Sequence, residues 1–258
     1  MNNHQKDGRV AVCFSGQARI SEKNINYFIK NIIEPFSNSG YDVDCFAHFW
    51  TYINESTTLS RVNNREMNMG LTGDYDNSVF DKLSYFNKQL KPVNIQLNKN
   101  LNEISEFKFD KLNHPHAAGY NSQYLSIQLA AMLCNNHEIE NNFKYDYVIR
   151  IRPDISIMTP LNIQELDNNF ICVSNVNAHG FGRTTFNELI HCNDQFAISS
   201  SDNMYKYSQI LDYTIDNLQK SWFIDEMNNK NIFGSERIFW LYVNTFSKIK
   251  KINLRISL

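Results

Sequence analysis

The sequence has no excess of positive charge. Its 25 lysine and arginine residues face 27 aspartate and glutamate residues, which gives a formal net charge of −2 at pH 7. Proteins that bind nucleic acids usually neutralise several phosphates with a basic surface, and a chain of this charge supplies no such field. We therefore expect no nucleic-acid partner.

Long apolar runs are also absent. No segment approaches the roughly 20 apolar residues that a transmembrane helix requires. The polar stretch Met1 to Arg9 is followed by an apolar run, Val10 to Phe14, that is too short for the core of a secretion signal. These features predict a cytoplasmic protein without a transmembrane segment, for which peripheral contact with a membrane stays open.

The cysteines lack the spacing of a metal site. There are five of them, widely separated and mostly within apolar runs. Neither Cys-X-X-Cys nor His-X-X-X-His occurs, so a structural zinc site is not expected. Scattered cysteines in an odd number are most simply explained by buried thiols in a reducing compartment.

The remaining composition is that of an ordered α/β protein. Of the 258 residues, 42% are hydrophobic and 20% are charged. Strand 9–14, helix 21–36 and strand 41–50 form a β-α-β unit, which predicts a parallel sheet. We expect one domain, 1–258, with regular alternation over about 9–157 and mixed elements over about 158–258. The other expected elements are loop 54–73, helix 81–90, strand 92–97, helix 122–141, strand 145–157, strand 170–173, a loop through Gly180 and Gly182, strand 195–198, helix 202–218 and helix 235–246.

A polar turn, Ser15 to Arg19, follows the first predicted strand. Open α/β sheets form their ligand crevices at the carboxyl ends of their strands. Gly16 permits close approach to the backbone, and Arg19 can bind a phosphate through two hydrogen bonds. The dinucleotide-binding fingerprint needs several glycines here and is absent. Ser15, Gly16, Gln17 and Arg19 are thus candidate nucleotide-binding residues, although a Ser-Gly turn after a strand is common.

The segment Tyr145 to Ile157 combines strong β character with unusual charges. Arg150, Arg152 and Asp154 are separated by steps of two, which places them on one face of an extended chain. Pro153 should end the strand, so Asp154 would project into the crevice. The carboxylate could hold a cation that bridges a diphosphate, while the arginines neutralise phosphate directly. The alternative is structural, with a buried Arg–Asp ion pair bracing the strand end.

These segments together resemble the bacterial and viral sugar transferases of capsule and lipopolysaccharide clusters. Similar proteins open with a strand and a Ser-Gly-Gln-X-Arg turn, have a strand that ends in His-X-Trp, and carry Tyr-Asp-X-Val-Ile-Arg-X-Arg-Pro-Asp. The last motif is matched here by Tyr145, Asp146, Val148, Ile149, Arg150, Arg152, Pro153 and Asp154. The matching patches are Arg9 to Arg19, Tyr41 to Trp50, Ser122 to Asp154 and Asn193 to Ala197.

The resemblance implies a GT-A fold, a Rossmann-type, mainly parallel sheet flanked by helices. Residues 9–157 would then bind the nucleotide sugar, and residues 158–258 would form a mixed acceptor-side half. Arg152-Pro153-Asp154 stands in the place of the usual Asp-X-Asp metal motif. Because Arg152 replaces the first aspartate, binding of Mn²⁺ or Mg²⁺ would rest mainly on Asp154.

His48 and Trp50 lie at the end of a predicted strand. Alternation places both on one face together with Phe46. Trp50 could stack on a base or a sugar, and His48 could hydrogen-bond to a phosphate or a hydroxyl, so both are candidate donor-binding residues. Packing in the core is an equally simple role for Trp50.

Asp194 and Glu236 are the candidate catalytic carboxylates. Asp194 belongs to a polar triplet directly before a short apolar strand, and Glu236 opens an apolar helix. Either could act as the base that the resemblance implies on the acceptor side. A favourable interaction with the helix dipole would by itself account for Glu236.

Residues and resemblance together predict a glycosyltransferase that moves a sugar from a nucleotide-sugar donor to a hydroxyl of a surface glycan. The arginines and Asp154 would stabilise the departing nucleoside diphosphate, and Asp194 or Glu236 would deprotonate the acceptor, a glycan or lipid-linked glycan. One alternative is a nucleotidyl- or phosphotransferase acting on sugar phosphates, which would be expected to carry a longer Gly- and Lys-rich loop. Another is a catalytically silent glycan-binding protein of the same fold.

Overall fold

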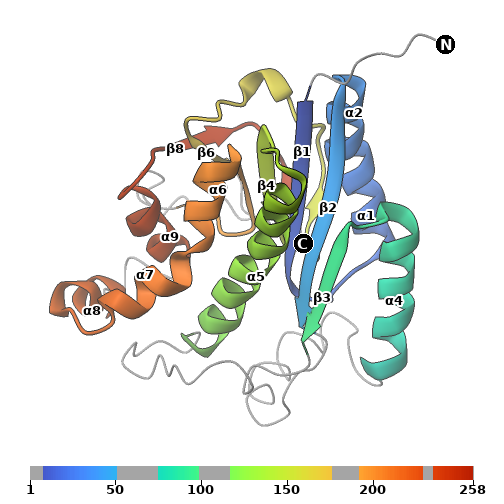
Figure 1. The fold of residues 1–258 in the computed structure, drawn as a ribbon. Helices are drawn as coiled ribbons and strands as arrows, with labels where there is room; N and C mark the ends of the chain where they lie inside the picture. Colours follow the sequence, from blue (N-terminus) through green and yellow to red (C-terminus); the bar gives the residue numbers. More distant parts are fainter. Residues whose placement is uncertain (1–7, 51–74, 99–116, 176–191, 229–234, 258) are drawn as a thin grey trace.

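The central element of the protein is a seven-stranded sheet with helices on both faces (Figure 1). The structure is a computed structural model, and it describes residues 8–50, 75–98, 117–175, 192–228 and 235–257. The expected loops at 54–73 and at Gly180 and Gly182 lie outside these ranges. The strands of the sheet are β1 (Gly8–Gln17), β2 (Tyr41–Trp50), β3 (Asn94–Asn98), β4 (Tyr147–Ile151), β6 (Ile171–Ser174), β7 (Phe196–Ser199) and β8 (Ile249–Ile252).

The strand order is β3-β2-β1-β4-β7-β6-β8. β1 pairs in parallel with both β2 and β4, and β2 pairs in parallel with β3. β7 runs antiparallel to both of its neighbours, and β6 and β8 are again parallel. The expected α/β class with a mainly parallel sheet is confirmed, and the arrangement is consistent with a Rossmann-like fold. A separate two-stranded ribbon joins β5 (Ser156–Ile157) to β9 (Ile256–Ser257).

Each face of the sheet carries its own hydrophobic core. Val10, Val12 and Phe14 of β1 face one side of the sheet, where they pack against a first group of helices, from the earlier part of the chain. Ala11 and Cys13 face the opposite side, which is covered by a second group, from the later part of the chain. The first group is α1 (Glu22–Phe28), the π-helical turn η1 (Ile29–Ile33), α2 (Glu34–Asn38) and α4 (Tyr75–Leu90). The second is α5 (Ala117–Asn141), α6 (Ser201–Ser208), α7 (Ile210–Asn217), α8 (Ser221–Asn228) and α9 (Ser235–Val243); a short 3-10 turn, η4, covers Ile163–Glu165.

The helical path from α1 to α2 includes Pro35 and continues to Asn38, slightly beyond the expected helix 21–36. Pro35 lies in the first turn of α2, directly after the π-helical turn. Proline has no N–H for the carbonyl four residues earlier, which belongs to Asn31. That carbonyl oxygen instead accepts a 2.8 Å hydrogen bond from the backbone N–H of Leu161, and the Asn31 side chain donates to the carbonyl of Ile157. Tertiary partners thus compensate for the proline and let the helical path continue.

Other boundaries also differ from the sequence-based expectation. The expected strand 145–157 is two strands, β4 and β5, which belong to different sheets. The expected helices 81–90 and 122–141 begin earlier, as α4 and α5.

The expected polar turn at Ser15 is still strand, because β1 remains paired with β2 as far as Gln17. The chain turns only afterwards, where the N–H of Arg19 donates to the carbonyl of Gln17. The expected helix 202–218 is two helices, α6 and α7, which meet at Gln209.

Among the described helices, none is both long and apolar enough to cross a membrane. The 25 residues of α5 come nearest in length, but glutamine, asparagine and glutamate interrupt them.

Candidate functional site

The candidate site lies where the chain reverses its direction across the sheet. From β1 the strand order proceeds outward through β2 to β3, and the chain then returns to β4 on the other side of β1. Such a switch point leaves a crevice at the carboxyl ends of the two central parallel strands. Here those ends carry the Ser15 to Arg19 segment and the Arg150 to Asp154 segment, which the strand pairing places side by side.

The Arg150 side chain links the end of β4 to the end of β1 and to the segment before β7. The side chain is buried, and its Nε donates a 3.1 Å hydrogen bond to Oγ of Ser15. Its Nη1 donates to the carbonyl oxygen of Asp194. Burial lowers the pKa of Arg150, and the neighbouring Tyr207 and Asp194 oppose that shift. Ser15 and Arg150 are therefore engaged with each other in the wall of the site.

Two donors beside this junction have no acceptor among the described residues. Within the described part of the chain, no hydrogen bond involves Nη2 of Arg150 or the hydroxyl of Tyr207, and both atoms are buried. A buried N–H without an acceptor is costly, so this is a place where water or an anionic ligand oxygen would be stabilising.

Arg152 and Asp154 form a two-pronged ion pair at the exit of β4. Nε of Arg152 lies 2.9 Å from Oδ1 of Asp154, and Nη2 lies 2.6 Å from Oδ2. Nη1 of Arg19 is 3.9 Å from the same Oδ2. Burial alone would raise the pKa of Asp154, but the guanidinium groups of Arg152 and Arg19 outweigh it and hold the pKa below its usual value. The ion pair between Arg152 and Asp154, which the sequence offers as the alternative to a ligand site, is thus present. Its two side chains are 25% and 15% exposed.

The turn residues are more accessible than the residues beneath them. Gly16, Gln17 and Arg19 are partly exposed, whereas Ser15 is fully buried. Gly16 has a φ of +131°, which side chains with a Cβ rarely adopt. If a Cβ were added at Gly16, the nearest atom would belong to Pro153, at 3.8 Å, which is an ordinary contact. The end of β1 therefore requires glycine at position 16 because of the backbone conformation and not for lack of space.

The two candidate carboxylates converge on the same region. Asp194 lies just before β7, and its Oδ2 accepts a 2.8 Å hydrogen bond from Nε2 of Gln123 on α5. Glu236 lies in the first turn of α9 and is partly exposed. Burial, followed by the charge of Asp194, raises the pKa of Glu236 to about 8, while Arg152 opposes the shift. Glu236 is therefore expected to titrate well above the ordinary range of a glutamate, as one member of an interacting pair of carboxyl groups does.

His48 and Trp50 are both buried in this structure. As the alternation predicts, their rings lie on one face and meet edge to face at 4.8 Å. His48 is fully buried; its Nδ1 lies 2.8 Å from Oγ of Ser126 and its Nε2 lies 3.1 Å from Oδ1 of Asn98. Trp50 donates from Nε1 to the carbonyl of Ser122. Burial lowers the pKa of His48 to about 4. Both residues pack between β2 and α5, the core role considered as the alternative for Trp50.

Sequence reasoning missed Gln123 and Tyr207. Gln123 is one of many polar residues on α5, and Tyr207 belongs to the apolar face of α6. Gln123 lies within the matching patch Ser122 to Asp154 but outside its quoted motif, and Tyr207 lies outside every patch. Only the packing of α5 and α6 over the sheet brings them to Asp194 and Arg150.

The described side chains around Asp154 do not form a preassembled site for a divalent cation. Mg²⁺ and Mn²⁺ need several oxygen ligands around one point. In the described ranges no three His, Cys, Asp or Glu side chains gather in this way. Asp154, the carboxylate expected to bind the metal, has both oxygens engaged by Arg152, and Arg19 stands beside it.

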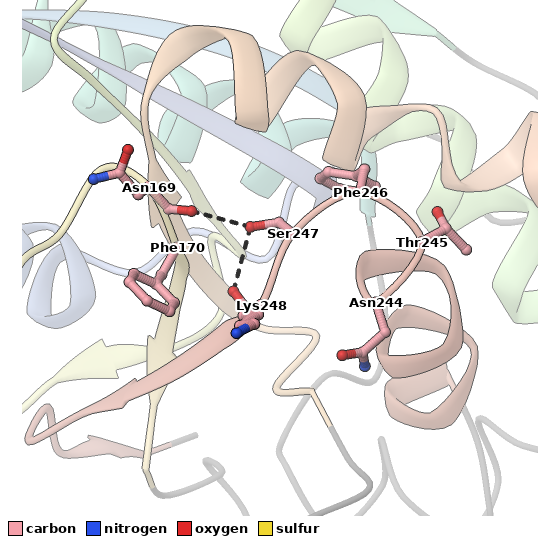
Figure 2. Close-up of a pocket in the computed structure, with 7 residues that line it drawn as sticks. All are labelled: Asn169, Phe170, Asn244, Thr245, Phe246, Ser247 and Lys248. Atoms are coloured by element: carbon pink, nitrogen blue, oxygen red, sulfur yellow. Dashed lines mark hydrogen bonds between the residues drawn. The ribbon is translucent and has the colours of Figure 1, made fainter.

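A surface hollow lies away from this charged cluster, at the amino ends of β6 and β8. It is lined by Asn169, Phe170, Asn244, Thr245, Phe246, Ser247 and Lys248, with Ser247 bridging to the carbonyls of Asn169 and Lys248 (Figure 2). β6 runs in the same direction as β4, because both are antiparallel to β7, which lies between them. The hollow at the start of β6 and Asp154 after the end of β4 therefore lie at opposite ends of the strands. Its single charged residue, Lys248, is exposed. The hollow has no converging titratable groups, unlike the switch-point crevice.

Comparisons with known proteins add no family. No protein-family model matches the sequence, and no curated protein matches it significantly. The fold and site define an α/β protein with a mainly parallel sheet and a charged cluster at its switch point.

Proposed function

We propose that the protein is a glycosyltransferase of the GT-A kind, which moves a sugar from a nucleotide-sugar donor to a hydroxyl of a surface glycan. The observation that carries this proposal is the convergence of two groups of residues at one switch point. Arg19 and Arg152 lie on the side of β1 and β4, and Asp194 and Glu236 lie on the side of β7 and α9. A group-transfer enzyme needs both a cationic leaving-group site and a base for the acceptor.

The leaving group would be stabilised by the arginines. As the bond between the anomeric carbon and the phosphate oxygen breaks, negative charge grows on the nucleoside diphosphate. Arg152 and Arg19 are about a quarter exposed, so phosphate oxygens can reach them from the crevice. Arg150 lies beneath and adds positive charge from the buried wall. Guanidinium groups suit this task because they bind phosphate through paired hydrogen bonds and keep their charge.

The acceptor would be activated by the pair formed by Asp194 and Glu236. The acceptor oxygen bonds to the anomeric carbon, and its proton passes to the ionised form of Glu236, beside Asp194. Base catalysis is most effective when the pKa of the base lies near the working pH, and the raised pKa of Glu236 brings it there. The acceptor, a glycan or lipid-linked glycan, and a cytoplasmic site of action with peripheral membrane contact belong to the same proposal.

The proposal can be tested by incubating the purified protein with UDP-, GDP- and dTDP-sugars and measuring free nucleoside diphosphate. A transferase should release the diphosphate slowly to water and faster with a suitable acceptor. Release of pyrophosphate in the presence of a nucleoside triphosphate and a sugar phosphate would instead identify a nucleotidyltransferase. Binding of a nucleotide sugar without any turnover would identify a silent binding protein.

A further inference from the structure

The carboxylate of Asp154 is already saturated with positive partners. Both of its oxygens accept hydrogen bonds from Arg152, at 2.9 and 2.6 Å, and Arg19 approaches one of them at 3.9 Å. Only 15% of the Asp154 side chain is exposed. A cation that approached this carboxylate would meet two guanidinium groups before it met a second oxygen ligand.

Arg152 has unused capacity on the side away from Asp154. A guanidinium has five N–H donors, and the pair with Asp154 uses two of them. Among the described residues, none accepts a side-chain hydrogen bond from Arg152 apart from Asp154. A quarter of the side chain is exposed, so the remaining donors can face a ligand. The Asp154 carboxylate fixes one edge of the guanidinium, and another edge stays accessible to the oxygen atoms of a ligand.

The strand end restricts this geometry further. The backbone N–H of Arg152 donates to the carbonyl of Gln195, which anchors the residue next to β7. Pro153 fixes the following backbone and is buried beneath the crevice. Arg152 is thus held both through its main chain and through its side chain, which reduces the entropy that binding would otherwise cost.

We propose that this site binds the diphosphate of the donor through Arg152 and Arg19 without a divalent cation, and that Asp154 is a positioning residue that orients the Arg152 guanidinium. The inference rests on the proposed function, since it concerns the leaving group of that reaction. It assigns Asp154 a role opposite to that of a metal ligand, because the carboxylate acts on the guanidinium and not on a cation.

Isothermal titration with UDP, GDP, CDP and ADP, in EDTA and in millimolar MnCl₂, tests this directly. The wild-type dissociation constant for the nucleotide that binds should differ by less than about twofold between the two media. Arg152→Ala and Arg19→Ala should each weaken binding by about tenfold or more in both media, by the loss of charge-assisted hydrogen bonds. Arg9→Ala is the matched control, because Arg9 lies at the other end of β1, is exposed and faces Phe143. It should leave the affinity unchanged.

The role of Asp154 needs a readout beyond folding. Asp154→Asn should weaken nucleotide binding several-fold in EDTA, whereas Asp154→Glu, which can still pair with Arg152, should recover most of the affinity. If Mn²⁺ tightens wild-type binding tenfold and Asp154→Asn removes that gain, Asp154 is a metal ligand and the inference is wrong, while the proposed function stands. If nucleotide binds independently of metal but Arg152→Ala and Arg19→Ala bind normally, the inference is also wrong. If no nucleotide binds in either medium, the proposed function itself fails. The wild-type comparison between media needs no variant, so a variant that does not fold still leaves a decisive result.

Discussion

The guanidinium of Arg150 donates a hydrogen bond to the main-chain carbonyl of Asp194. This contact joins two residues that are 44 positions apart in sequence, one in β4 and the other just before β7, the antiparallel neighbour of β4. It places the arginine-rich end of β4 directly against the segment that carries a candidate catalytic carboxylate. The proposed leaving-group and acceptor sides of the site therefore share one buried junction.

Arg150→Ala should destabilise the fold. The change removes the donor to Ser15 Oγ and to the Asp194 carbonyl, leaves both acceptors buried, and opens a cavity. We expect the free energy of unfolding to fall by about 2–4 kcal/mol. Urea denaturation followed by circular dichroism measures this, with Arg9→Ala as the control at the exposed end of β1. Equal stability of Arg150→Ala and the wild type would show that the junction does not support the fold.

Arg152→Ala should separate activity from stability. The ion pair with Asp154 is mostly buried, but Arg19 stays beside the carboxylate, so the loss of stability should be smaller than the about 3–5 kcal/mol expected when a buried charge is left without a partner. Loss of one electrostatic donor to a leaving group costs about 2–4 kcal/mol of transition-state stabilisation, or roughly two orders of magnitude in kcat. The variant should therefore remain folded at the assay temperature and yet turn over very slowly. A variant that instead unfolds while its residual folded fraction keeps full turnover would support a purely structural ion pair.

The raised pKa of Glu236 predicts a pH dependence of stability. In the folded protein its pKa is about 8, against 4.5 for an ordinary glutamate, so the folded state holds a proton that the unfolded state has released between these values. The stabilisation is complete below pH 4.5 and is lost as the pH rises towards 8. The free energy of unfolding should fall over this window in the wild type and fall less in Glu236→Gln, as urea titrations at several pH values would measure.

The electrostatic interaction between Glu236 and Asp194 leads to a second prediction about the pH dependence of stability. Asp194→Asn removes the negative charge that contributes to the raised pKa of Glu236. The pH at which the loss of stability levels off should therefore shift downward in Asp194→Asn. An unchanged profile in both Glu236→Gln and Asp194→Asn would mean that this carboxyl pair does not titrate as a unit.

The sequence predicts the framework well because the relevant signals are local. The short β-rich runs at β1, β2 and β4, separated by helical periodicity, indicate parallel strands, and Pro153 marks the end of β4. The rule that ligand crevices lie at strand ends then brings the Ser15 and Arg152 segments together. These steps need only the pattern within each segment.

The rest depends on packing between distant segments. Whether His48 faces solvent or core is decided by α5, which covers that face of β2, and alternation cannot tell which face will be covered. The approach of Asp194 to Arg150 depends on the antiparallel insertion of β7 between β4 and β6. The helical path through Pro35 depends on the N–H of Leu161, which a reading of 21–36 alone does not include.

The most direct test of the account is the release of nucleoside diphosphate from a panel of nucleotide sugars, measured for the wild type, Arg152→Ala, Glu236→Gln and the control Arg9→Ala. The account predicts release by the wild type and by Arg9→Ala, and roughly hundredfold slower release by Arg152→Ala. It also predicts that Glu236→Gln loses transfer to an added glycan acceptor but still binds the donor. If the folded wild type binds no nucleotide sugar and releases no diphosphate from any of them, the charged cluster at the ends of β1 and β4 is not a glycosyltransferase site.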